Sequence, residues 1–266
     1  MSTIRKQQPM HLPHRLDRTV VIQATPATVF SFFTESERWA SWWGAGSTVE
    51  PRTGGRVYIR HANGIESSGE VVEVEPPRRF VFTYGFNSGN PMPPGSSLVT
   101  ISLEPAGAAT RLQLVHDFAE ASPRDEHVQG WRYQLSVFAN VVTDLANARA
   151  ADAVDAWFKS WSEKDEDRRR KTLADIAISG VQVRDRFSLL EGIDDLVRHI
   201  GATQRFMPDM NLQRRGEVRH CQGTLLIGWA ATNAAGEERG TGTNVFTLRA
   251  DGKIESVTGF WDPPRV

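Results

Sequence analysis

The sequence predicts a two-domain α+β protein in which each domain packs helices against a curved, mainly antiparallel sheet. A run of short strand-like segments closes on one long amphipathic helix around Trp131–Val142, and a module with a different order of elements begins near Asp152. The chain of 266 residues also exceeds the usual size of one domain, which favours two domains of about 100–150 residues each. We place these domains at residues 16–150 and 151–266.

The first domain reads as an antiparallel meander that grips a helix around a cavity. Thr19–Ala24 alternates like a half-buried strand, and Ala27–Thr34 follows as a helix with Thr25 as its cap. Pro123 opens the long helix, whose apolar residues recur at spacings of three and four. Between these helices, Gly, Pro and Asn clusters separate five predicted strands. The strands are Arg56–His61, Gly69–Glu75, Arg79–Tyr84, Leu98–Glu104 and Thr110–Phe118.

The second domain has the order helix, helix, strand, helix, meander. Its first helix repeats apolar residues from Val154 to Trp161, and the mixed charges of Glu163–Lys171 are typical of a solvated helix face with acid-first i,i+4 pairs. The segment 147–153 is Ala-rich and could continue the preceding helix. The remaining predicted elements are a strand at Gly180–Phe187, a helix at Ile193–Phe206, and strands at Gly216–His220, Thr224–Ala231, Gly240–Arg249 and Lys253–Trp261.

Composition excludes several classes of partner. The net charge is −1 with basic and acidic residues interspersed, so we expect no nucleic-acid or membrane-surface binding. No window resembles a signal peptide or a membrane span. Cys221 is the only cysteine, which suits a reducing cytoplasm and a buried structural thiol. The histidines lack metal-ligand spacing and Gly54-Gly55 lacks the context of a phosphate loop. The sequence therefore predicts no metal and no cofactor.

The first domain resembles the SRPBCC superfamily of helix-grip proteins, and within it the group named after activators of heat-shock protein ninety ATPase. The resemblance is carried by the motifs ATPATVFSFFT, WASWWG, EPRTGGRVYI, SGEVVEVEPPRRFVFTY and LVHDF followed by HVQGW. It implies a helix-grip fold. It does not fix an activity, because the superfamily includes lipid and polyketide binders, cyclases and stress-related proteins.

The second domain resembles the SnoaL-like branch of the nuclear-transport-factor-two-like cone fold. The supporting motifs are VRDRFSLLEGIDDLVRHI, DGKIESVTGFWDP and the Trp-rich first helix. This resemblance implies a cone-shaped, curved-sheet α+β domain. Relatives with that shape include ketosteroid isomerases, polyketide cyclases and catalytically silent binders.

In the first domain, several polar or amphipathic side chains are expected to reach the groove between sheet and helix and to bind a small apolar ligand. For His116 a second interpretation, a hydrogen-bonded histidine of the core or rim, stays open. Its neighbour Asp117 points to the opposite face of a strand, which argues against a catalytic dyad. The candidate ligand-binding residues are Trp42, His61, Tyr84, His116 and Trp131, with Glu70 as a further groove residue.

In the second domain, the resemblance places Asp185 where related enzymes carry a basic carboxylate in an apolar cavity. Asn244 lies where isomerases carry a second acid, and Trp157 roughly where they carry a tyrosine donor. The alternative for Asp185 is a strand-end acid paired with Arg184, Arg186 or Arg205. By strand alternation, further residues could also face the cone interior, although core filling explains the aromatic members at least as well. They are His220, Trp229, Thr241, Thr243, Phe260 and Trp261.

The sequence thus predicts binding, or cyclase- or isomerase-like processing, of a polyketide-, steroid- or lipid-like ligand. The alternative is a non-catalytic stress-response or regulatory adaptor with a ligand-sensing cavity. We also expect a homodimer through the second domain, with Trp229, Phe246 and Trp261 on the pairing strands.

Overall fold

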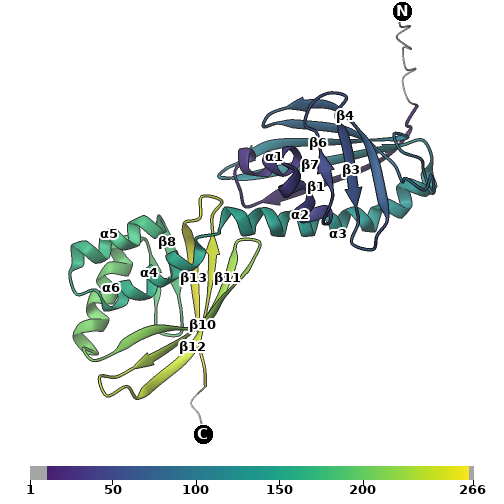
Figure 1. The fold of residues 1–266 in the computed structure, drawn as a ribbon. Helices are drawn as coiled ribbons and strands as arrows, with labels where there is room; N and C mark the ends of the chain where they lie inside the picture. The colour runs from purple at the N-terminus through teal and green to yellow at the C-terminus, as the bar shows by residue number, and fades with distance from the viewer. Residues whose placement is uncertain (1–10, 264–266) are drawn as a thin grey trace, which may run out of the picture. The chain divides into compact units, whose positions relative to one another are not determined.

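The computed structural model describes residues 11–263, and the predicted α+β class is confirmed. The chain divides into two compact units, the first ending at Val142 and the second beginning at Thr143 (Figure 1). The sequence analysis placed the boundary between two independently folding domains near residue 150, and this boundary stays a prediction. Residues 1–10 and residues 264–266, the end of the predicted second domain, lie outside the described part. No helix within the described range is long and apolar enough to cross a membrane.

The first unit contains a seven-stranded antiparallel sheet with the order β1-β7-β6-β5-β4-β3-β2. The strands from β3 to β7 follow one another along the sheet, so the predicted meander is confirmed. The long helix α3 begins two residues before Pro123 and is continuous past the end of this unit. The elements are β1 (His14–Ile22), α1 (Pro26–Thr34), α2 (Ser36–Trp43), β2 (Thr48–Val49), β3 (Arg56–Arg60), β4 (Glu66–Glu75), β5 (Arg79–Tyr84), β6 (Ser97–Ala106), β7 (Ala109–Phe118) and α3 (Ala121–Ala146).

Aromatic side chains join the helices of the first unit to its sheet. Thr25 caps α1 by accepting a hydrogen bond from the Thr28 N–H. The helix buries Phe33, whose ring lies 5.0 Å from Phe138 of α3 and 6.0 Å from Phe80 of β5. Trp42 of α2 contacts Phe138 at 4.8 Å. The core therefore lies between the sheet and the three helices.

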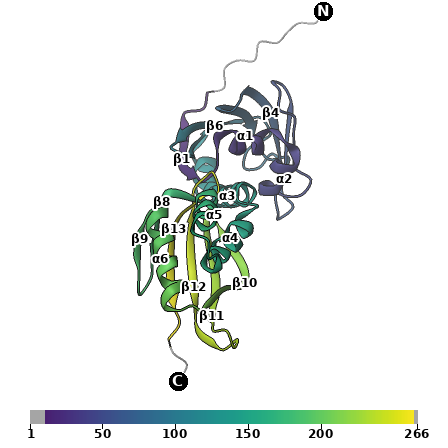
Figure 2. The ribbon, with the colours of Figure 1, turned by 90° about the vertical axis from the view of Figure 1, so that its left-hand side faces the viewer.

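The second unit contains a six-stranded sheet with the order β10-β11-β12-β13-β8-β9, in which only the β13–β8 pair is parallel. Figures 1 and 2 show α4, α5 and α6 together on one face of this sheet. The predicted order of elements holds, with β9 as an additional strand. The elements are α4 (Ala150–Ser162), α5 (Glu166–Ile176), β8 (Ala177–Arg184), β9 (Leu189–Glu191), α6 (Ile193–Phe206), β10 (Asn211–Cys221), β11 (Thr224–Thr232), β12 (Glu238–Leu248) and β13 (Ile254–Trp261).

Two predictions about local structure need correction. The segment 147–153 does not continue α3: the helix ends at Ala146, where the Asn147 side chain donates back to the Thr143 carbonyl, and α4 starts at Ala150. The predicted strand to Phe187 ends at Arg184 instead, because the Asp185 side chain organises a turn there.

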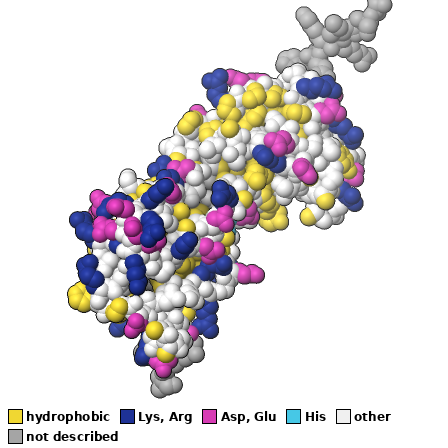
Figure 3. Space-filling model, turned by 60° about the vertical axis from the view of Figure 1, so that its left-hand side comes forward, with side chains coloured by type: hydrophobic (Ala, Val, Ile, Leu, Met, Phe, Trp, Pro, Cys, Tyr) yellow, Lys and Arg dark blue, Asp and Glu magenta, His cyan; other side chains and the backbone are white. Residues whose placement is uncertain are grey.

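The charge run on α5 is only partly a solvated face. Glu166 and Arg170 form the expected i,i+4 ion pair at 3.1 Å, but Asp165 caps the helix by accepting from the Arg168 N–H. Arg169 is buried, and its guanidinium donates to the Glu163 carbonyl and to Gln204 Oε1. Figure 3 shows basic and acidic side chains intermixed over the helices of this unit. The visible face thus carries no patch of a single sign.

Candidate functional site

A cavity of about 660 Å³ lies in the first unit between α2, α3 and the sheet. Four of the predicted ligand-binding residues line it together: Trp42 from α2, His61 after β3, Tyr84 from β5 and Trp131 from α3. These side chains come from separate elements and converge only in the folded unit. The volume lies within the usual range of small-molecule sites, about 300–1,000 Å³.

Helix α2, which the sequence analysis did not predict, places two tryptophans at this cavity. It ends at Gly44, where φ is +150° and an added Cβ would lie 2.2 Å from the Arg60 carbonyl oxygen. Only glycine permits this approach between the end of α2 and the end of β3. The approach sets Trp43 against His61, with ring centroids 5.6 Å apart, while the Trp42 indole donates to the Phe32 carbonyl at 3.3 Å.

A small polar cluster interrupts the aromatic wall. His61 Nε2 lies 3.1 Å from Ser67 Oγ and 3.4 Å from the Tyr84 hydroxyl, and Ser67 donates to that hydroxyl at 3.1 Å. Burial raises the pKa of Tyr84 to about 12 and lowers the pKa of His61 from its usual value. Both groups are therefore neutral at physiological pH. Glu70 lies outside this cluster, because it is three residues beyond Ser67 on β4 and faces the opposite side of the sheet.

His116 lies behind the cavity wall in a hydrogen-bonded chain whose direction is fixed. The Trp131 indole can only donate, so His116 Nδ1 accepts its hydrogen bond at 3.0 Å. His116 Nε2 then carries the proton and donates to Ser97 Oγ at 2.8 Å, and Ser97 donates to the Tyr84 carbonyl at 2.8 Å. His116 is fully buried, and burial lowers its pKa well below the usual value. This geometry favours the satisfied core histidine over a group that touches a ligand.

His127 also lines the cavity, and the sequence analysis did not single it out. Its Nδ1 lies 2.6 Å from the Pro123 carbonyl oxygen and must donate to it, which leaves Nε2 as an acceptor. Burial lowers the pKa of His127 despite that bond. The signal was present in the sequence: His127 precedes Trp131 by four residues on a helix, so both share one face.

The second unit brings the two predicted catalytic residues close together. A Cβ added to Gly259 would lie 3.1 Å from both Asn244 Oδ1 and Asp185 Cβ. Asp185 is half-buried, and its Oδ1 accepts from the Phe187 N–H and the Ser188 hydroxyl, both at 2.7 Å. Among the described residues, the hydrogen-bond partners found for the Asp185 carboxylate are Phe187, Ser188 and Trp261, and an ion pair with Arg184, Arg186 or Arg205 is not among its contacts. Asp185 stabilises its own turn through Oδ1 and accepts from the Trp261 indole through Oδ2 at 3.5 Å. A role as a base stays a prediction.

We expect Asp185→Asn to lower the free energy of unfolding by no more than about 1 kcal/mol, because asparagine keeps the Oδ1 acceptor of the turn. Asp185→Ala removes that acceptor and should cost about 1–2 kcal/mol. Urea unfolding of both variants measures the difference. A carboxylate that serves as a base would additionally lose about 10²–10⁴ in rate on the change to asparagine, whereas a turn residue would leave any turnover intact.

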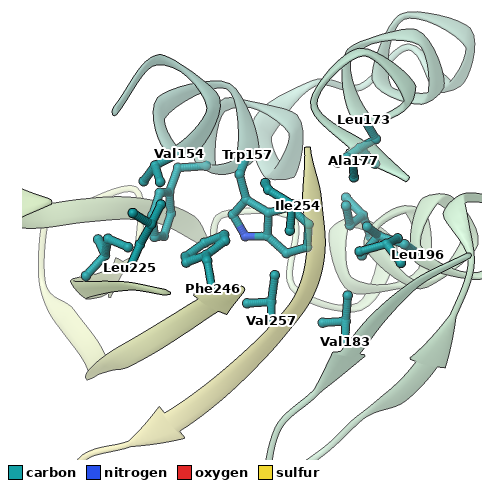
Figure 4. Close-up of a cluster of buried hydrophobic side chains, with 14 of the residues drawn as sticks. Val154, Trp157, Leu173, Ala177, Val183, Leu196, Leu225, Phe246, Ile254 and Val257 are labelled. Carbon is teal, nitrogen blue, oxygen red and sulfur yellow. The ribbon is translucent and has the colours of Figure 1, made fainter. Parts of the chain in front are cut away.

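The aromatic residues predicted to face a second cavity lie mainly in a packed core. Figure 4 shows Trp157 between the helices and the sheet, with its ring 5.6 Å from Phe246. Trp157, Trp229 and Phe246 are all nearly inaccessible to solvent. Trp261 is partly exposed and packs on Trp229 at 4.8 Å. Core filling therefore explains Trp157 and Trp229.

Two polar residues at the end of β10 also differ from expectation. His220 does not point into a cone: its Nδ1 donates to Asp144 Oδ1 at 2.7 Å, and its Nε2 accepts from the Gly223 N–H at 2.9 Å. It thus stabilises the β10–β11 turn. Cys221 is exposed and is not the buried thiol that the sequence predicted, because it lies next to that turn at the end of an edge strand.

The first unit also matches a known family. Residues 23–143 match the family model of Activator of Hsp90 ATPase homolog 1-like proteins. The first unit is similar to this family, and we call it the AHSA1-like domain. This match confirms the resemblance predicted from the sequence motifs, and it covers less than half of the chain. No curated protein matches the chain.

Solved structures similar to parts of the chain include members of both predicted types. A SnoaL-like family protein from Agrobacterium tumefaciens is 23% identical over 45% of this chain and 99% of its own, with a TM-score of 0.41. Protein Ms6760 from Mycobacterium smegmatis is 23% identical over 49% and 89%, with a TM-score of 0.42. The Aha1 dimer from Colwellia psychrerythraea is 16% identical over 46% and 90%, with a TM-score of 0.40. Likenesses of this size do not assign an activity to this chain.

Proposed function

We propose that the AHSA1-like domain binds a small, mainly apolar molecule in the cavity between α2, α3 and the sheet. The observation that carries this proposal is the convergence of Trp42, Trp43 and Trp131 with the Tyr84 cluster around about 660 Å³. Apolar walls with a few fixed polar groups are the usual composition of a ligand site. The same cavity would serve a binding protein or the sensing part of an adaptor. We further propose that the protein acts in the cytoplasm.

Gly130 offers a test of this function that leaves the fold intact. It lies on α3 and lines the cavity, and a Cβ added there would meet nothing within 4 Å. Gly130→Ala should therefore stabilise the helix by up to about 1 kcal/mol and keep binding. Gly130→Phe should place a ring in the cavity mouth and weaken binding of an apolar dye at least tenfold. Tryptophan fluorescence during dye titration measures the affinity of both variants.

Native mass spectrometry of the purified full chain provides the complementary measurement. The wild-type protein should retain a small molecule, and Gly130→Phe should not. If the folded Gly130→Phe variant binds dye and ligand as tightly as Gly130→Ala does, the cavity is not the binding site. Conversion of the retained molecule by the wild type would add a catalytic role, whereas retention without conversion fits a binding protein or adaptor.

We also propose that the second unit forms a homodimer through the sheet face that carries no helix. The residues first predicted for this contact need correction, because Trp229 and Phe246 face the helices. On the open face, Leu226, Val245 and Thr258 form a partly exposed row across three neighbouring strands. Leu226 and Val245 give the open face an apolar centre.

Light scattering at micromolar concentration should return a dimer mass for the wild type and a monomer mass for Val245→Arg, which would bring like charges together across a symmetric contact. Phe206→Arg on α6 is the matched control, since Phe206 is exposed on the helical side. A monomeric wild type would remove this proposal.

A further inference from the structure

The charge of the AHSA1-like cavity restricts the ligands that it accepts. Among the described residues that line it, none is lysine or arginine, and Glu126 is the one carboxylate. Glu126 is exposed, so it lies at the rim. His61 and His127 are neutral because burial lowers the pKa of each. A carboxylate or phosphate in this cavity would have no cationic partner, and burying an unpaired anion is strongly unfavourable.

Tyr84 supplies a hydrogen-bond donor for a ligand. The shorter imidazole contact in the polar cluster joins His61 Nε2 to Ser67 Oγ, which favours His61 as the donor to Ser67. Ser67 in turn donates to the Tyr84 hydroxyl. Because the Tyr84 oxygen accepts from Ser67 and His61 Nε2 carries a proton, the hydroxyl hydrogen of Tyr84 is available to an acceptor in the cavity.

A second donor lies beside it. Trp43 lines the cavity and is 7% exposed, and its indole Nε1 is buried without an acceptor among the described residues. A buried donor without a partner is uncommon in folded proteins and points to an acceptor that the polypeptide does not supply. Trp43 and Tyr84 both belong to the wall of the same cavity. An oxygen atom on the ligand is the acceptor that the Tyr84 hydroxyl would meet, and Trp43 Nε1 is buried within the same wall.

Aromatic rings make up a large part of the wall. Trp43 meets Trp131 and His61 with centroids 5.6 Å apart in each case, and Tyr84 meets Phe86 at 5.6 Å, all in near-perpendicular arrangements. An aromatic ligand could pack against these rings in stacked or edge-to-face contact.

We propose that the ligand is an uncharged aromatic compound that carries a carbonyl oxygen, which accepts a hydrogen bond from the Tyr84 hydroxyl. This inference rests on the proposed binding function and narrows it to one chemical class. It excludes fatty acids and other anionic amphiphiles, because the wall supplies donors and aromatic rings but no cation.

Three probes with the same naphthalene skeleton test the inference on the full chain by ligand-observed NMR titration. They are the neutral ketone 2-acetylnaphthalene, the anion 2-naphthoate and the acceptor-free 2-ethylnaphthalene. The ketone should bind at least tenfold more tightly than the anion and about fivefold more tightly than the hydrocarbon. In Tyr84→Phe, the advantage of the ketone over the hydrocarbon should disappear.

A second variant keeps the test decisive if Tyr84→Phe fails to fold. Glu126→Lys adds a cation at the exposed rim, and it should raise the affinity for 2-naphthoate several-fold while leaving the ketone unchanged. Equal binding of ketone and anion by the wild type, or an unchanged anion affinity in Glu126→Lys, would overturn the inference and leave cavity binding in place. Failure of all three probes to bind would overturn the proposed function as well.

Discussion

Replacing Trp131 by alanine should lower the free energy of unfolding of the AHSA1-like domain by about 3–5 kcal/mol, the usual cost of removing a large buried aromatic side chain. Trp131 is 4% exposed and its ring packs against Trp43. The change also leaves His116 Nδ1 without its donor, which adds about 1–3 kcal/mol for an unsatisfied buried acceptor. Urea unfolding, with the change read from the shift in midpoint, measures the loss.

Two variants on the same helix separate these contributions. Trp131→Phe keeps one aromatic ring but loses the N–H group and part of the buried indole, so its loss of stability should be smaller than that of Trp131→Ala. Tyr133→Ala removes a side chain that is 68% exposed and should change stability by no more than about 0.5 kcal/mol. If Trp131→Ala proved as mild as Tyr133→Ala, neither the buried ring nor its bond to His116 would be part of the folded core. Dye affinity is informative only for variants that remain folded.

Much of the fold could be predicted because its elements have regular patterns. The strands of both units alternate, and the apolar stripe of α3 repeats every three to four residues. Helix α2 was missed because it is short and WASWWG is rich in tryptophan without a clear helical repeat, and its end depends on the close approach of Gly44 to the Arg60 carbonyl. That approach joins two segments distant in sequence, which local patterns do not reveal.

The cavity residues could be predicted only by side-chain type. Trp42, His61, Tyr84 and Trp131 stood out as large amphipathic groups beside a predicted groove. Ser67 and Ser97, which form hydrogen bonds with His61 and His116 in the two histidine networks, look like ordinary small residues at strand positions. Their role depends on cross-strand register, and a strand pattern alone does not specify which residues lie opposite one another.

In the second unit, alternation could not say which face of the sheet the helices cover. Trp229 and Phe246 were therefore assigned to a cavity or a dimer contact, whereas the helices bury both. Which face of the sheet is buried depends on how α4, α5 and α6 pack against it, and the sequence pattern of a single strand does not contain this information. Asp185 is a similar case. The sequence motif located the carboxylate, but only the folded turn shows that its Oδ1 accepts hydrogen bonds from Phe187 and Ser188.

Acidification from pH 7.5 to 5.5 should destabilise the AHSA1-like domain, and His116 should account for about 1.4 kcal/mol of the loss. Above its usual pKa of 6.5, His116 is neutral in the folded and unfolded states, and its contribution to stability is constant. Below pH 6.5, His116 binds a proton in the unfolded chain but not in the folded domain, because burial lowers its pKa in the folded state. Stability therefore falls as the pH falls. His61 and His127, whose pKa values are also lowered, act in the same direction.

The comparison of wild type with His116→Gln isolates this contribution. Glutamine does not titrate, so the variant should lose about 1.4 kcal/mol less than the wild type between the two pH values, although it starts from a lower stability at pH 7.5. Urea unfolding at both pH values gives the two differences, and the chosen interval lies above the range in which carboxylates titrate. Equal losses in both proteins would mean that His116 accepts a proton in the folded domain. The bond from the Trp131 indole to His116 Nδ1 could not survive such a proton, so that result would also contradict the fixed direction of the hydrogen-bonded chain behind the cavity.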